Sequence, residues 1–214
     1  MHKNNINLSK KILTWYDNNK RILPWRVGHK SKKKHYYRIL SEFMLQQTQV
    51  KTVIPYFNNF ISNIPNLKKL SKTSEKKVLK LWEGLGYYKR AKNLHRTSKI
   101  LVNEFDEKIP NNFIKLKELP GIGDYTANVL LALIYNEPRI GIDSNVKRLL
   151  QRIFNVNIDK ASYSFKTKRN GDLAEALMEF GSLICKSKDP LCSQCKINDI
   201  CLYYKSNIKT NFSE

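Results

Sequence analysis

Apolar residues recur at helical spacing through most of this chain, and this periodicity restricts its fold more than any other feature. Stretches such as "NVLLALIY" (128–135) and "NVKRLLQRIF" (145–154) place apolar residues three and four positions apart, whereas strand-like alternation is scarce. Prolines fall mostly between such runs, where they would separate one helix from the next. The sequence therefore predicts an all-α fold of many short helices with tight connections.

The chain is strongly basic, with 39 Lys and Arg against 18 Asp and Glu in 214 residues, a net charge of +21. A field of this sign attracts polyphosphate and contributes much of the affinity for DNA or RNA. Coding bias accounts for the preference for Lys over Arg, but not for the excess over acids. The first 20 residues lack the continuous apolar stretch that a signal peptide would need, and no later segment reaches the length of a membrane span. We expect a cytoplasmic protein with a nucleic-acid partner and no membrane association.

All four cysteines lie in "CKSKDPLCSQCKINDIC" (185–201), with the spacing C-x6-C-x2-C-x5-C. A reducing compartment disfavours disulfides. Structural zinc usually takes two close pairs of ligands, and only Cys192 and Cys195 form such a pair. Four thiolates along one loop can instead wrap an iron–sulfur cube. The spacing favours the cluster over zinc, and either group would clamp a loop too short to fold by itself.

A possible phosphate-binding turn lies in "KELPGIGDYTANVLLALIY" (117–135), between a helix end and an apolar helix. Gly121 and Gly123 permit positive φ and close backbone approach, so we expect their N–H groups to converge on a phosphate near the helix N-terminus. The alternative is an ordinary helix–helix turn. The stretch resembles the helix-hairpin-helix motif of DNA-repair glycosylases.

Three further segments extend the resemblance: "SEFMLQQTQV" (41–50), "LWEGLGYYKRAKNLH" (81–95) and "IDSNVKR" (142–148). With the hairpin and the cysteines, they resemble the A/G-specific adenine DNA glycosylases, the MutY-like branch of the endonuclease III superfamily. The resemblance runs from about Trp15 to Cys201. It implies a six-helix barrel subdomain over 28–140, which carries the hairpin, and an iron–sulfur subdomain made of 1–27 plus 141–214.

The implied cofactor is a 4Fe-4S cluster held by Cys185, Cys192, Cys195 and Cys201. The implied activity is removal of adenine mispaired with 8-oxoguanine or guanine in double-stranded DNA, by hydrolysis of the N-glycosidic bond, and we expect a monomer. Two other functions compete with it. One is a thymine glycosylase at T·G mismatches, and the other is a noncatalytic iron–sulfur DNA-binding protein. "MLQQTQV" favours adenine as the substrate.

The resemblance assigns Glu42 as the acid that protonates adenine and Asp143 as the carboxylate that stabilises the oxocarbenium-like sugar, with a transient covalent adduct. Burial of Glu42 among apolar neighbours would raise its pKa, although the residues alone favour an exposed position at the edge of an amphipathic helix. Asp143 precedes a helical run, where capping and catalysis are compatible. Tyr125 replaces the Schiff-base lysine of strand-cleaving relatives, which predicts a monofunctional enzyme. Its alternative role is packing at a helix start.

Other positions match family residues that contact DNA. Gln47 and Tyr87 would wedge into the base stack, and Thr48 would contact the orphaned base. Arg26 and Glu175 would line the adenine pocket, with Asn145 holding the Asp143 region. Trp25 and Met178 are its expected apolar walls, or else plain core residues.

The chain also departs from the family pattern. Only 13 residues follow Cys201, so we expect the domain that reads 8-oxoguanine to be absent. The span between Arg152 and Gly171 looks short by about one helix. "HKSKKKHYYR" (29–38) carries a basic insertion, expected as a solvated loop touching DNA backbone, and Ser144 stands where the family usually has Gly.

Overall fold

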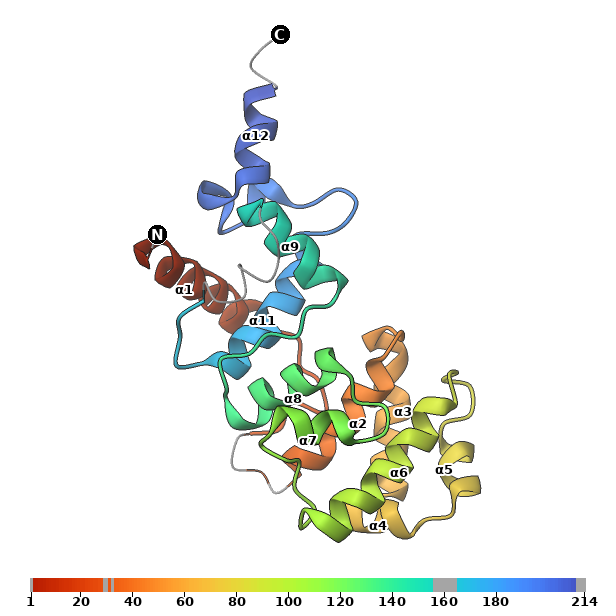
Figure 1. Ribbon diagram of the computed structural model, residues 1–214. Coiled ribbons are helices and arrows are strands. Elements are labelled where there is room, and N and C mark those ends of the chain that lie inside the picture. Colours follow the sequence, from red (N-terminus) through yellow and green to blue (C-terminus); the bar gives the residue numbers. More distant parts are fainter. Residues whose placement is uncertain (1, 29–30, 32, 156–164, 211–214) are drawn as a thin grey trace. The chain divides into compact units, whose positions relative to one another are not determined.

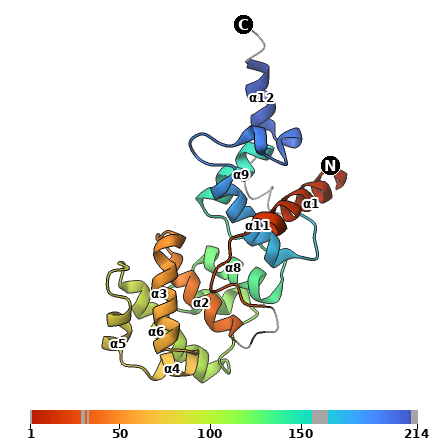
Figure 2. The same ribbon diagram turned by 180° about the vertical axis from the view of Figure 1, so that it is seen from behind.

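The computed structural model describes residues 2–28, 31, 33–155 and 165–210, and every α-helix or 3-10 turn that follows lies within these ranges. Figures 1 and 2 show the described chain as helices joined by loops, without a strand, which confirms the all-α prediction. The elements are α1 (His2–Asn19), α2 (Lys34–Leu45), α3 (Val50–Asn63), α4 (Leu67–Lys72), α5 (Glu75–Leu81), α6 (Lys89–Glu104), α7 (Phe113–Glu118), α8 (Asp124–Tyr135), α9 (Ser144–Phe154), α11 (Asn170–Leu183), η2 (Cys192–Gln194), η3 (Asn198–Ile200) and α12 (Leu202–Thr210).

The chain divides into two compact units. The middle unit is residues 22–135, and the terminal unit joins residues 1–21 to 136–214. The boundaries that the sequence predicted lay a few residues later, at 27/28 and 140/141. Two features of the sequence fall partly outside the described residues: His29, Lys30 and Lys32 of the basic insertion, and 156–164 of the shortened span.

The middle unit is built around α2, which packs against α3, α6 and α8. The apolar positions of these helices meet in one core whose largest fully buried side chains include Phe43, Phe57, Phe60 and Trp82. Short helices at its edge begin with side-chain caps, because Asn66, Ser74 and Asn112 each accept a backbone N–H of the first turn. This unit holds its helices by burial of apolar surface and by caps placed at helix starts.

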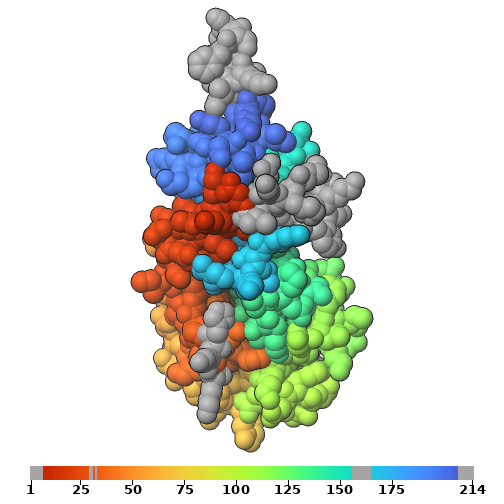
Figure 3. Space-filling model, turned by 90° about the vertical axis from the view of Figure 1, so that its left-hand side faces the viewer, coloured from red at the N-terminus to blue at the C-terminus, as the bar shows by residue number. Residues whose placement is uncertain are grey.

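The terminal unit packs α1 against α11, and α9 against α11 and α12. Trp15 meets Phe180 edge to face, with ring centroids 4.9 Å apart, in a second apolar core. At the surface, Lys11 of α1 pairs with Asp199 of η3 at 2.6 Å, so α1 lies beside the C-terminal segment (Figure 3). Two chain ends distant in sequence thus share one core.

None of the helices in the described part of the chain has both the length and the apolar character that crossing a membrane would require.

Candidate functional site

Glu42 lies in the second half of α2, in the middle unit, and only 9% of its surface is exposed. Its helix neighbours Ile39 and Phe43 are fully buried in the core. Burial, and not the exposed edge of an amphipathic helix, is therefore the environment of this carboxyl. Little of this side chain is therefore open to water.

The turn that follows α2, residues 46–49, carries Gln47 and Thr48. Gln47 has φ of +56°, a left-handed conformation that non-glycine residues seldom adopt. The Thr48 N–H donates to the carbonyl of Leu45 at 3.2 Å, which closes the turn. We call this segment the glutamine turn.

A second strained turn carries Tyr87, before the start of α6. Tyr87 has φ of +49° and is 60% exposed, so a large aromatic residue stands at the surface. Strained backbone that persists in a fold is concentrated at functional sites. We call residues 84–88 the tyrosine turn.

The two glycines of the hairpin between α7 and α8 differ in backbone conformation and in surroundings. Gly121 has φ of +85°, and a Cβ there would lie 2.8 Å from a Phe43 ring atom and 2.9 Å from Asn93 Cβ. Gly123 differs: its φ is not positive, and an added Cβ would meet nothing within 4 Å. Only Gly121 uses the positive φ that both glycines permit, because the chain has already turned there and enters α8 with ordinary backbone angles.

Tyr125 occupies the second position of α8 and is half-buried. The hairpin is closed by an ion pair between Lys117 and Asp124 at 2.6 Å. Arg26 lies on the loop that leads to α2, with its N–H donating to the Leu23 carbonyl. Trp25 is 3% exposed and packs edge to face on Phe57, which makes it part of the core.

Asp143 belongs to the terminal unit and caps α9. Its Oδ1 accepts the N–H of Val146 at 2.7 Å, and its Oδ2 accepts the Asn145 side-chain amide at 3.2 Å. Arg148 donates to Asn145 Oδ1 at 2.9 Å and to the Cys185 carbonyl at 2.9 Å. Both carboxylate oxygens are thus held in one orientation, and a short chain of contacts leads from Asp143 to the first cysteine.

Glu175 lies on α11 and is 8% exposed. Its Oε2 accepts the hydroxyl of Tyr16 at 2.7 Å. Met178, one turn further along α11, packs at the margin of the terminal core. These two residues share a helix, and the tyrosine of α1 fixes the carboxylate.

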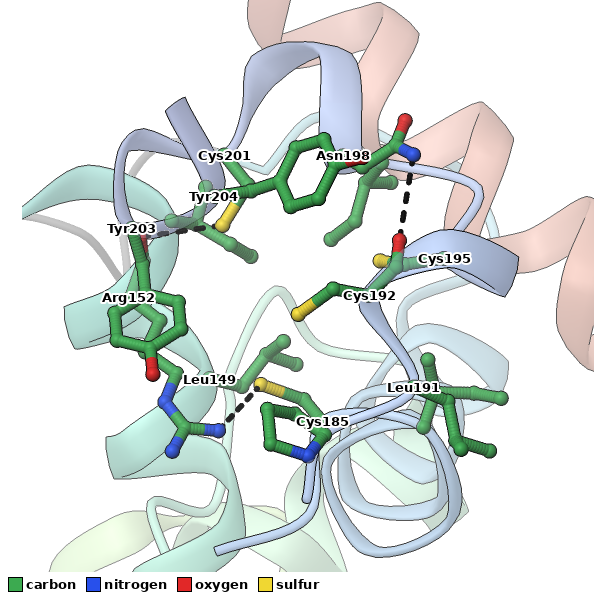
Figure 4. Close-up of a pocket in the computed structure, with 14 residues that line it drawn as sticks. Leu149, Arg152, Cys185, Leu191, Cys192, Cys195, Asn198, Cys201, Tyr203 and Tyr204 are labelled. Atoms are coloured by element: carbon green, nitrogen blue, oxygen red, sulfur yellow. Dashed lines mark hydrogen bonds between the residues drawn. The ribbon is translucent and has the colours of Figure 1, made fainter. Parts of the chain in front are cut away.

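The four cysteines line one pocket together with residues of α9 and α12 (Figure 4). All four are free thiols. Arg152 contacts the first and the last of these cysteines. Its guanidinium donates to Cys185 Sγ at 3.5 Å, and its carbonyl accepts a hydrogen bond from the Cys201 thiol at 3.3 Å. Within the described chain, no group of three or more His, Cys, Asp or Glu side chains is placed to hold a single metal ion. The thiols surround a space and do not converge on one point.

Burial raises the pKa of three of these thiols. The pKa of Cys195 rises to about 11 because of desolvation, with smaller contributions from the neighbouring cysteines. Desolvation also raises the pKa of Cys192 and Cys201. Four thiolates in this pocket would therefore need the positive charge of a bound metal group.

Comparison with known proteins shows which family the chain resembles. A model of the HhH-GPD superfamily base excision DNA repair proteins matches residues 40–170, a span that contains the hairpin. The adenine DNA glycosylase of Buchnera aphidicola subsp. Schizaphis graminum is 40% identical over 211 residues, 92% of this chain and 59% of that protein. The human adenine DNA glycosylase is 35% identical over 207 residues, 89% of this chain and 38% of that protein. The chain thus spans less than two thirds of either relative.

Two solved structures share the fold. A thermostable thymine-DNA glycosylase superposes with a TM-score of 0.82 at 23% identity, over 94% of this chain and 96% of that one. Endonuclease III in a non-covalent DNA complex superposes with a TM-score of 0.75 at 16% identity, over 95% and 96%. Together with the family match across the hairpin and both carboxylate segments, this leads to one conclusion. The chain belongs to the HhH-GPD superfamily of base excision DNA repair proteins.

Proposed function

We propose that this chain is a DNA glycosylase that removes adenine mispaired with 8-oxoguanine or guanine. The observation that carries the proposal is the 40% identity to an adenine DNA glycosylase over 92% of the chain, a share large enough to take in residues of both units. The net charge of +21 suits a double-stranded DNA partner. The enzyme would act as a monomer on DNA in the cytoplasm.

Glu42 would protonate adenine, which leaves poorly as an anion. Its burial in α2 supports this role, since a proton donor works best where water does not compete. Asp143 would stand beside the sugar as positive charge develops, and would form the transient adduct. Support comes from the two hydrogen bonds that orient its carboxylate, one of them from Asn145.

Tyr125 supports a monofunctional reaction, because a phenol has no amine with which to form a Schiff base to the sugar. The product would be an abasic site in an unbroken strand. Gln47 and Tyr87 would fill the stack as adenine leaves the duplex, and Thr48 would contact its former partner. Arg26 and Glu175 would line the base pocket, while Gly121 and Gly123 would present backbone N–H groups to a phosphate.

Cys185, Cys192, Cys195 and Cys201 would hold a 4Fe-4S cluster. The fit rests on four free thiols around one pocket and on burial that disfavours uncompensated thiolates. When bound, the cluster would cross-link the segment 185–201. The segment would then present Lys186, Lys188 and Lys196 to a phosphate backbone.

A single-turnover assay on A·8-oxoguanine, A·G and T·G duplexes tests the proposal. We expect free adenine from the first two, with strand breakage only after hot alkali. Release of thymine alone would replace adenine with the thymine activity, and tight mismatch binding without base release would point to a noncatalytic protein. A break without alkali that persists in a preparation free of other nucleases would contradict the monofunctional assignment.

A further inference from the structure

Arg90, on the first turn of α6, is a charged side chain that is only 7% exposed. Its Nη1 donates to the carbonyls of Phe43 and Met44 at 3.2 and 2.8 Å, and also to the Gln46 carbonyl. The first two carbonyls end α2 and have no partner within that helix. The guanidinium therefore caps the C-terminus of α2, where a positive charge also suits the helix dipole.

The second nitrogen of the same guanidinium serves the tyrosine turn. Nη2 donates to the carbonyls of Leu85 and Gly86 at 3.3 and 3.1 Å. The Arg90 guanidinium carbon also lies 5.3 Å from the Tyr87 ring centroid and 5.5 Å from that of Trp82. The buried Arg90 guanidinium thus connects the backbone of the glutamine turn to the backbone of the tyrosine turn.

The same face of α6 also supports the hairpin. Asn93, three residues after Arg90, lies under Gly121, and Thr97 donates its hydroxyl to the Pro120 carbonyl at 3.0 Å. The side-chain amide of Gln46 donates to the Gly121 carbonyl at 3.3 Å, which joins the glutamine turn directly to the hairpin. Arg90, Asn93 and Thr97 are three, four and seven positions apart and so lie on one side of α6. This side of the helix contacts the glutamine turn, the tyrosine turn and the hairpin.

Arginine is required for this contact set. A lysine ammonium is a single point of charge, whereas two guanidinium nitrogens reach two groups of carbonyls at once. The chain favours lysine throughout, with 30 Lys and 9 Arg, so an arginine here stands against its general composition.

We propose that Arg90 is a positioning residue that locks the glutamine turn and the tyrosine turn into one rigid surface, so that Gln47 and Tyr87 enter a DNA base stack together. Its action on DNA rests on the proposed function, whereas its locking of the turns does not. Both turns hold strained backbone at the residue that projects, and such strain persists only when the surroundings enforce it. Prior ordering of the two side chains lowers the entropic cost of inserting them.

Amide hydrogen exchange on the free full-length chain tests the lock. We compare wild type with Arg90→Met and Arg90→Lys, and with Arg96→Met as the control, which removes the same charge from an exposed position of α6. The amides of Thr48 and Leu85, one in each turn, donate to the carbonyls of Leu45 and Trp82. In Arg90→Met we expect exchange at both amides to rise about tenfold or more. Exchange in the cores of α3 and α8 should stay within about twofold of wild type. Unchanged exchange in the turns, or acceleration throughout the middle unit, would overturn the proposal.

Mismatch binding provides the second measurement. A 2-aminopurine placed beside the A·8-oxoguanine pair reports unstacking, and affinity is measured for mismatched and matched duplexes. Arg90→Met should reduce the mismatched-to-matched affinity ratio by about tenfold, with Arg90→Lys between it and wild type. Arg96→Met should weaken both duplexes alike and preserve the ratio. An unchanged ratio in Arg90→Met would refute the proposal. If wild type itself shows no mismatch preference, the proposed function fails, and hydrogen exchange still decides whether Arg90 locks the turns.

Discussion

The middle unit and the segment 185–201 of the terminal unit are held in different ways. The middle unit buries large aromatic side chains, among them Trp82 and Phe57, and holds its turns with buried hydrogen bonds from Arg90. In the terminal unit, the segment 185–201 buries only Ile197 and Cys201 among its described residues. Apolar burial holds the middle unit and the helices of the terminal unit, whereas the segment 185–201 has little of it and places four thiols where a bound group would hold it.

The largest expected effect comes from the two carboxyls, one on each unit. Glu42→Gln and Asp143→Asn should each slow base release by about 10²- to 10⁴-fold, because an amide can neither donate the proton nor stabilise positive charge on the sugar. Duplex affinity should change by less than about threefold, since the proposed roles of both side chains concern the base and the sugar and not the DNA backbone. Single-turnover rates and binding curves measure both.

Glu104→Gln, the same change at an exposed position of the middle unit, is the control. The double variant should be little slower than the slower single variant, because under the proposed function both carboxyls act in one transition state. If either single variant kept the wild-type rate, the role proposed for that carboxyl would be wrong.

Loss of one proposed cluster ligand should destabilise the terminal unit and leave the middle unit intact. Cys192→Ser should lower bound iron and the broad absorbance near about 400 nm that iron–sulfur proteins show. It should also destabilise the terminal unit by several kcal/mol, because metal binding free energy is folding free energy. Hydrogen exchange should rise in α9 and α12 and stay low in the core of the middle unit.

Ser193→Ala, in the same loop and exposed, should keep iron and stability. Zinc without iron in the purified wild type would replace the cluster with a zinc site. Equal loss of protection in both units would show that the thiols support the whole chain.

The two hairpin glycines of the middle unit should differ in how much each contributes to stability. Gly121→Ala should destabilise it by roughly 2–4 kcal/mol, because the added methyl meets Phe43 and Asn93 and the backbone is left-handed. Gly123→Ala should change the free energy of unfolding by less than about 0.5 kcal/mol. Urea unfolding midpoints measure both variants. Equal midpoints would mean that the hairpin yields easily and that Gly121 is not tied to α6.

The smallest effect is a pH dependence confined to the middle unit. Desolvation lowers the pKa of both His35 and His95 below the ordinary value of 6.5, and the N–H of Ile109 donates to neutral His35 at 3.0 Å. The unfolded chain binds these protons first, so stability is full above pH 6.5 and falls as pH drops below it. The slope should be at most about 1.4 kcal/mol per pH unit for each group, less solvent screening.

Unfolding free energies between pH 7.5 and 5 check this expectation. His95→Gln should flatten the profile, since glutamine does not titrate. A profile that rises toward low pH would contradict the assigned direction.

Much of the fold and part of the candidate site followed from local patterns. Helical spacing predicted α8 and α9, and Asp143 was recognised at the start of α9, where it caps the helix. Arg90 escaped prediction because its acceptors Phe43 and Met44 lie more than 40 residues away in the chain. The one signal was an arginine in a lysine-rich sequence. Gly121 and Gly123 looked equivalent because their difference depends on Asn93 of another helix.

Local sequence patterns were enough to predict the all-α class, the capped start of α9 and the gathering of the thiols in one segment. Each depends on interactions between residues a few positions apart, which the order of amino acids specifies directly. The tertiary structure alone decided that Glu42 is buried, that Gly121 is the constrained glycine, and that Arg90 joins two turns. Burial and hydrogen-bond partners come from helices distant in sequence, so only packing brings them together.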